Sequence, residues 1–166
     1  MEPTARKSLK KKWPRKNLGE LINFIESKET DGLTLDALSQ RLGVSKGSIS
    51  NVFCHDDMKL SRAEEISSIY GYRLSIYFPT PYYGFEDGME PCEKKRAFPN
   101  AGNLTGLINY IQQSDLTISY AAVKTGVSPN VLYRAFNTGD IMISTLNRCT
   151  DALNIRTIWE FEKINK

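Results

Sequence analysis

Residues Thr34–Phe53 decide the fold, and they read TLDALSQRLGVSKGSISNVF. A similarly built stretch, TISYAAVKTGVSPNVLYRAF, occupies Thr117–Phe136, and corresponding residues at both ends are 83 positions apart. In each copy a Gly-Val-Ser tripeptide separates two segments whose apolar residues recur at helical spacing. Glycine permits a tight turn, and serine can cap the helix that follows. The pattern predicts two short helices joined by a turn, present twice.

The residues Ala37 to Ser50 follow the pattern Ala-Leu-(x)3-Leu-Gly-Val-Ser-(x)3-Ile-Ser. This pattern resembles the lambda repressor/Cro-like (XRE-type) helix-turn-helix of bacterial and phage regulators. The second copy matches at Gly126-Val127-Ser128 and at Leu132, and it departs at Thr125, where the pattern has an apolar residue. The resemblance implies an all-α chain with two tandem lambda-repressor-like domains. It also implies sequence-specific binding of double-stranded DNA by a transcriptional regulator.

The repeat extends toward the N-terminus of both stretches. Asn17–Ile25 and Asn103–Ile111 share an apolar helical stripe, but their offset is 86 rather than 83. The first copy therefore contains three additional residues. We place this insertion in the loop Lys28–Leu33, which contains the turn signal Asp31-Gly32.

The repeat also extends toward the C-terminus, where each copy predicts a further helix. Ser61 and Ser144 are the expected N-caps of these helices. Gly71 and Asn154 occupy the same place after the helices and suit a left-handed C-terminal cap. Each copy is therefore expected to be a whole domain and not only a helical hairpin.

The two copies differ after this helix. Residues 72–78 alternate apolar and polar side chains and predict a short strand, whereas residues 155–162 predict a closing helix. A single strand needs a partner, and Pro79 and Pro81 disfavour a tight hairpin with the segment that follows. We therefore expect the strand to pair with its copy in a second molecule and form a homodimer. The argument against a dimer is that the tandem repeat already supplies two helix-turn-helix motifs that could contact DNA.

The expected organisation has four parts: a basic arm (1–16), a first domain (17–78), a Pro- and Gly-rich linker (79–101) and a second domain (102–166). The arm holds seven Lys/Arg and one Glu, a net charge of +6, whereas the first domain carries −3 and the second +1. We expect the arm to be flexible and to grip phosphates or the minor groove. A solvated tail that aids solubility is the alternative.

The resemblance also implies which residues contact DNA, because the second helix of this motif lies in the major groove. By resemblance Lys46, Gly47 and Asn51 reach bases, and we expect Asn130 to read adenine and Arg134 guanine. The alternative for each exposed polar residue is a solvated helix face. The expected DNA-binding set is Ser45, Lys46, Gly47, Ser48, Ser50, Asn51, Ser128, Asn130, Tyr133, Arg134, Asn137, Lys10, Lys11, Lys12, Arg15 and Lys16.

Other classes of function have less support in the sequence. There is no apolar run of about 18 residues and no signal-type segment, so we expect a cytoplasmic, nucleoid-associated protein without a membrane partner. Three dispersed cysteines and a single histidine lead us to expect no metal or other cofactor. Without a P-loop, GxSxG or HExxH motif, an enzyme is not expected. The acidic first domain leaves one alternative open, a protein-interaction or dimerisation module in which one domain no longer contacts DNA.

Overall fold

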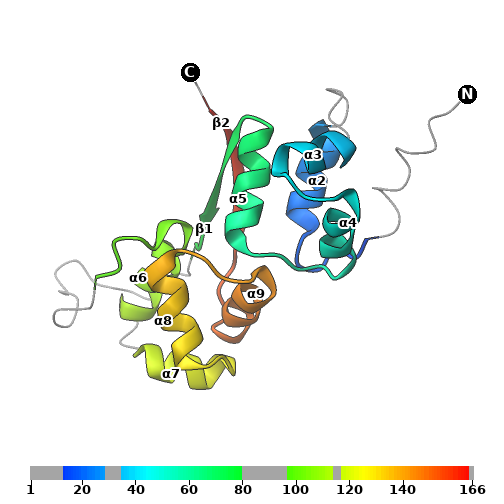
Figure 1. Ribbon diagram of the computed structural model, residues 1–166. Coiled ribbons are helices and arrows are strands. Elements are labelled where there is room, and N and C mark those ends of the chain that lie inside the picture. The colour runs from blue at the N-terminus through cyan, green and yellow to red at the C-terminus, as the bar shows by residue number, and fades with distance from the viewer. Residues whose placement is uncertain (1–12, 29–34, 80–96, 114–116, 165–166) are drawn as a thin grey trace, which may run out of the picture. The chain divides into compact units, whose positions relative to one another are not determined.

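The computed structural model describes residues 13–28, 35–79, 97–113 and 117–164. Over these residues the chain is predominantly helical with a small two-stranded sheet, which confirms the predominantly α class (Figure 1). The chain divides into two compact units. Unit 1 comprises the chain up to Leu74 with Met142–Ser144 and Phe161–Lys166, and unit 2 comprises Ser75–Ile141 with Thr145–Glu160.

Unit 1 contains α2 (Gly19–Lys28), α3 (Leu35–Leu42), α4 (Lys46–Cys54) and α5 (Leu60–Ile69), labelled in Figure 1. Each helix turns apolar residues inward at the three- and four-residue spacing that the sequence predicts. The fully buried side chains of this core include Leu18, Leu21, Ile22, Leu38, Phe53, Leu60 and Ile66.

The start of α2 is held by Asp56, which follows α4 and is buried. The Asp56 carboxylate accepts hydrogen bonds from the backbone N–H groups of Asn17 and Leu18, at 2.8 and 2.9 Å. The first N–H groups of a helix have no partner within the helix, and this carboxylate binds the N–H of Leu18 at the start of α2 together with that of Asn17 just before it. Asp56 has a positive φ of 55°, which the turn after α4 requires.

Unit 2 repeats this order. It contains the 3-10 turn η3 (Gly102–Leu104), α6 (Thr105–Gln113), α7 (Ile118–Thr125), α8 (Pro129–Thr138) and, from Thr145, the body of α9 (Ile143–Ala152). The fully buried side chains of this core include Leu104, Leu107, Ile111, Ala121, Leu132, Phe136, Leu146 and Cys149.

Gly139 stands in unit 2 where Asp56 stands in unit 1, and its φ is also positive, at 75°. A Cβ atom on Gly139 would lie 2.5 Å from the carbonyl oxygen of Asn100 and 3.1 Å from that of Ala101. The chain just before η3 therefore packs directly on the glycine backbone. Both units thus tie the turn after the second hairpin helix to the start of the first helix, by a carboxylate in one and by close packing in the other.

Thr125 departs from the apolar pattern but is buried in unit 2. Its hydroxyl donates to the carbonyl oxygen of Ala122 at 3.2 Å and accepts from the backbone N–H of Val127 at 3.4 Å. The polar residue is tolerated because its hydroxyl has both an acceptor and a donor partner inside the core.

The strand predicted after the first domain is confirmed as β1 (Tyr72–Tyr77). The closing helix predicted at the C-terminal end is wrong, because residues Ile158–Lys163 form the strand β2. β1 and β2 pair in a two-stranded sheet. The segment IWEFEK has aromatic and β-branched residues that favour a strand, and β1 supplies partners for its backbone groups.

The register of this pair shows that the strands are antiparallel. The backbone N–H of Ile164 donates to the carbonyl oxygen of Gly71 at 2.9 Å, and Arg73 forms an ion pair with Glu162 at 2.9 Å. The partner of β1 thus belongs to the same chain. The reason for expecting β1 to pair with a second molecule, that its own chain offers no partner strand, is therefore wrong, and the homodimer itself stays a prediction.

The helix ends follow the sequence in part. Gly71 and Asn154 are left-handed as predicted, with φ of 86° and 57°. Ser61 and Ser144 are not N-caps, because α5 and α9 each begin one residue earlier. Instead, Ser144 donates its backbone N–H, at 2.9 Å, and its hydroxyl to the Asp57 carboxylate. The predicted insertion loop and most of the predicted linker lie outside the described residues.

Candidate functional site

The pairs α3–α4 and α7–α8 carry most of the residues predicted to contact a partner. Their turn glycines, Gly43 and Gly126, have left-handed φ values of 71° and 73°. Ser45 caps α4, and its Oγ accepts a hydrogen bond from the backbone N–H of Ser48 at 3.0 Å. Ser128 is the N-cap residue of α8 but makes no side-chain cap hydrogen bond. Both turns therefore form as predicted, although only the first has the predicted serine cap.

Helix α4 separates an apolar face from a polar one. Ile49 and Phe53 are buried. The predicted contact residues lie on the other sides of the helix, where Ser50 is half-buried and the exposed ones are Ser45, Lys46, Gly47, Ser48 and Asn51. This exposure follows from helical periodicity, and it fits contact with DNA as well as a solvated face.

An acidic side chain lies beside this polar face. The Lys46 Nζ atom is 3.4 Å from the Asp36 Oδ1 atom, and the two side chains are 59 % and 66 % exposed. An exposed pair of this kind contributes about 0–1 kcal/mol to stability. Its larger effect is on the local potential, because Asp36 offsets the positive charge of the predicted base-reading lysine. Sequence reasoning did not single out Asp36, although its place in the first turn of α3 is visible in the sequence.

Helix α8 presents a longer polar stripe. Leu132 and Phe136 are buried, whereas Asn130, Arg134 and Asn137 are all exposed. These three lie at i, i+4 and i+7, so they follow one side of the helix. Two amides and one guanidinium in a row form a surface that can donate and accept several hydrogen bonds along a groove.

The charge around α8 differs from that around α4. From Thr117 to Gly139 the chain contains Lys124 and Arg134 and no acidic residue. The position that corresponds to Asp36 is Ser119. The α7–α8 pair therefore has no negative side chain of its own to oppose a phosphate backbone.

Tyr133 is only half-buried, and part of its ring packs within unit 2. Its centroid lies 6.5 Å from that of Phe98, with the rings tilted by 40°. Phe98 in turn meets Phe136 edge-on at 5.6 Å. The predicted DNA contact by Tyr133 is thus restricted to the exposed part of its side chain.

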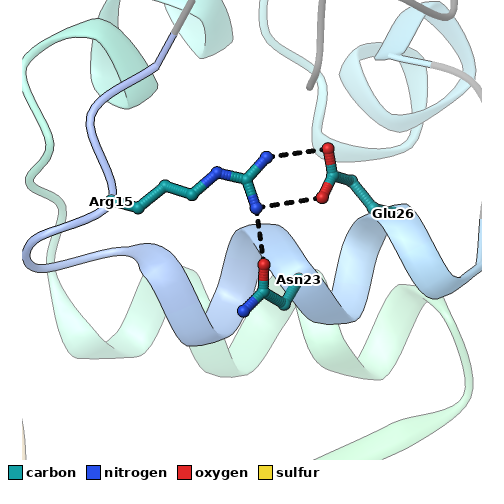
Figure 2. Close-up of polar contacts among 3 residues, drawn as sticks. All are labelled: Arg15, Asn23 and Glu26. Carbon is teal, nitrogen blue, oxygen red and sulfur yellow. Dashed lines mark hydrogen bonds and ion pairs between the residues drawn. The ribbon is translucent and has the colours of Figure 1, made fainter. Parts of the chain in front are cut away.

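The described part of the predicted arm contains Arg15 and Lys16. Lys16 is exposed, whereas Arg15 is held by α2 (Figure 2). The Arg15 guanidinium donates to both carboxylate oxygens of Glu26, at 3.0 and 2.8 Å, and to the side-chain oxygen of Asn23. The hydrogen bond with Glu26 raises the pKa of Arg15 above its ordinary value. Arg15 is therefore anchored on unit 1, and Lys10, Lys11 and Lys12 lie outside the described residues.

An apolar group that the sequence reasoning missed lies on α7 and α8. Val123 is 80 % exposed, and Tyr120 and Val131 are also exposed. The corresponding residues of the first copy are Ala37, Gln40 and Ser48, which are smaller or polar. The signal was present in the sequence, because the helical phase that buries Ala121 turns Val123 outward.

Comparison with known proteins finds no matching family, no similar curated protein and no similar solved structure. Within the described residues, no helix is long and apolar enough to cross a membrane. The same part of the chain contains no group of three or more His, Cys, Asp or Glu side chains placed to hold a metal ion. The argument for a function therefore rests on the two helix pairs and their surfaces.

Proposed function

We propose that the chain binds double-stranded DNA in a sequence-specific manner and acts as a cytoplasmic, nucleoid-associated regulator of transcription. In this proposal α3–α4 and α7–α8 are two lambda repressor/Cro-like helix-turn-helix motifs. The observation that carries the proposal is the stripe of Asn130, Arg134 and Asn137, which lies opposite the buried Leu132 and Phe136.

The chemistry of this stripe suits the edges of base pairs in the major groove. An arginine donates two hydrogen bonds to O6 and N7 of guanine, and an asparagine pairs in the same bidentate way with N6 and N7 of adenine. Arg134 is thus assigned to guanine, and Asn130 to adenine. Each such pair discriminates against a wrong base by about 1–3 kcal/mol.

The two motifs are expected to contribute unequally. DNA binding requires positive potential at the phosphates. The α7–α8 pair contains no acidic residue, whereas Asp36 pairs with Lys46 beside α4. In addition, α4 has Gly47 and Cys54 at the positions of Asn130 and Asn137, which leaves Asn51 as its main base-reading side chain. We therefore assign most of the direct base readout to α8 and a smaller share to α4.

Selection of binding sites from a randomised DNA duplex, followed by titration of variants, tests this proposal. Arg134→Ala is expected to weaken binding to the selected site roughly 5- to 150-fold, the equivalent of one lost bidentate pair, and to relax preference at one base pair. Arg156→Ala is the matched control, because Arg156 is an exposed arginine outside both helix pairs and should leave the base preference unchanged. Failure of the wild-type chain to enrich any sequence would refute the proposal.

A second candidate function follows from the apolar group on α7 and α8. Exposed valines and tyrosine suit contact with another protein, so unit 2 would be an interaction module that no longer contacts DNA. The same experiment separates the two functions. If the wild-type chain binds DNA and Arg134→Ala changes neither affinity nor sequence preference, DNA contact belongs to α4 alone and this second function is favoured.

A further inference from the structure

Val131 is an exposed apolar residue in the first turn of α8, where 45 % of its surface is accessible. The corresponding residue of α4 is Ser48, which belongs to the helix cap. The backbone N–H of Ser48 donates to the Ser45 hydroxyl at 3.0 Å, and that hydroxyl donates to the hydroxyl of Ser48 at 2.9 Å. In α8 the N-cap Ser128 makes no side-chain cap hydrogen bond. The repeat therefore has a capping serine in one copy and an exposed isopropyl group in the other.

The stability of α8 does not account for a valine at this position. A β-branched residue favours a helix less than alanine or a straight-chain residue does, because its χ1 angle is restricted there. An exposed side chain also gains little from burial in the core. A single exposed valine is ordinary on a protein surface, so the residues around Val131 decide what it can do.

The neighbours of Val131 are the residues proposed to read bases. Val131 lies three residues before Arg134 and Asn130 lies four residues before it, and side chains at these spacings are neighbours on a helix surface. All three residues are exposed. The outward side of α8 thus presents an isopropyl group and an amide beside one guanidinium. Because χ1 of a valine in a helix is already restricted, its methyl groups lose little conformational freedom on contact with a ligand.

The major groove of DNA offers one partner for such a group. Thymine is the only one of the four bases that presents a methyl group there, and apolar side chains contact it. We propose that Val131 is a specificity-determining residue that reads a thymine through its C5-methyl group, beside the bases read by Asn130 and Arg134. This inference rests on the proposed function and deepens it. At the corresponding position α4 has a serine whose hydroxyl is engaged in the cap, so the thymine belongs to the half-site read by α8.

Uracil tests this contact because it lacks only the C5-methyl group of thymine and keeps every hydrogen-bonding group. Each thymine of the selected site is replaced in turn by deoxyuridine, and binding of the full chain is titrated. For the wild type we expect a loss of about fourfold at one thymine of the α8 half-site, the effect of leaving one methyl group in water. Val131→Ala should weaken binding to the thymine duplex several-fold and bind the thymine and uracil duplexes equally at that position.

Val123→Ala is the matched control, because Val123 is an exposed valine of α7 and the substitution removes the same atoms. It should keep the fourfold effect of uracil. Val131→Ala is expected to fold, since the residue is exposed and alanine favours a helix, and circular dichroism checks this.

Two results would overturn the inference and leave the proposed function intact. One is a selected site at which no thymine-to-uracil change alters the affinity of the wild type. The other is an effect of uracil that is as large in Val131→Ala as in the wild type. Failure of the wild type to enrich any sequence would overturn the proposed function, and this inference with it.

Discussion

The substitution Gly139→Ala tests the repeat architecture most directly, because Gly126→Ala provides a matched control in the same unit. The two glycines have nearly the same left-handed φ, 75° and 73°. A Cβ atom on Gly126 would meet no atom within 4 Å, whereas on Gly139 it would lie 2.5 Å from the carbonyl oxygen of Asn100. The comparison therefore isolates close packing from backbone conformation.

The expected losses of stability follow from the left-handed backbone conformation and from the close packing. Placing an L-residue in the left-handed region costs about 1–2 kcal/mol, and replacing glycine returns about 0.4–1 kcal/mol through the unfolded state. Gly126→Ala should therefore lower the free energy of unfolding by about 1 kcal/mol. Gly139→Ala has in addition to displace the backbone at Asn100 and Ala101, which as overpacking costs about 1–3 kcal/mol more.

Urea denaturation followed by circular dichroism measures both losses, and hydrogen exchange of peptides from α6 and α8 locates them. We expect Gly139→Ala to speed exchange at the start of α6 as well as in α8, because the displaced backbone directly precedes η3 and α6. Equal losses of stability in the two variants, with unchanged exchange in α6, would refute the packing of residues 100–101 on Gly139.

Two further predictions concern unit 1 and the core of unit 2. Asp56→Ala should lower the free energy of unfolding by about 1–3 kcal/mol, because the buried N–H group of Leu18 and the part-buried N–H group of Asn17 lose their acceptor. Asp56→Asn should lose about half as much, and urea titration measures both losses. Burial raises the pKa of the Cys149 thiol, so alkylation at pH 8 should modify the exposed Cys54 at least about tenfold faster, as site-resolved mass spectrometry would show. The Cys149 thiol ionises readily only in the unfolded chain. The contribution of the buried neutral thiol to the free energy of unfolding should therefore be present below the ordinary thiol pKa of 9.0 and be lost as the pH rises above that value.

The helical hairpins could be predicted from the sequence because their signals are local. A turn glycine, a capping serine and an apolar stripe each act within a few residues, and Gly43 and Gly126 adopt the predicted conformation. The strand β2 could not be predicted in the same way. Ile158 and Trp159 fit a helical stripe as well as a strand, and the deciding partner, β1, lies more than 80 residues earlier in the chain.

The same distinction holds for the candidate site. Helical periodicity alone turns Asn130 and Arg134 outward, so their exposure could be predicted. The contacts that modify the site are tertiary, and composition does not show them. Asp36 meets Lys46 across the turn between two helices, and Arg15, which belongs by charge to the basic arm, is bound by Glu26 of α2.

The repeat preserves the interior of each hairpin while its outer surfaces differ. Ile49 and Phe53 are matched by Leu132 and Phe136, which are equally buried. The outward positions Gly47, Asn51 and Cys54 are matched by Asn130, Arg134 and Asn137, which carry different hydrogen-bonding groups.

If both helices read one duplex, as we propose, the two half-sites must therefore differ in sequence. A symmetric dimer on a palindrome binds identically in both orientations, whereas two unlike helices within one chain fix a single orientation on the duplex. A selected site that is a perfect palindrome would contradict this reasoning. An asymmetric site would mean that the bound protein has one defined orientation on the DNA.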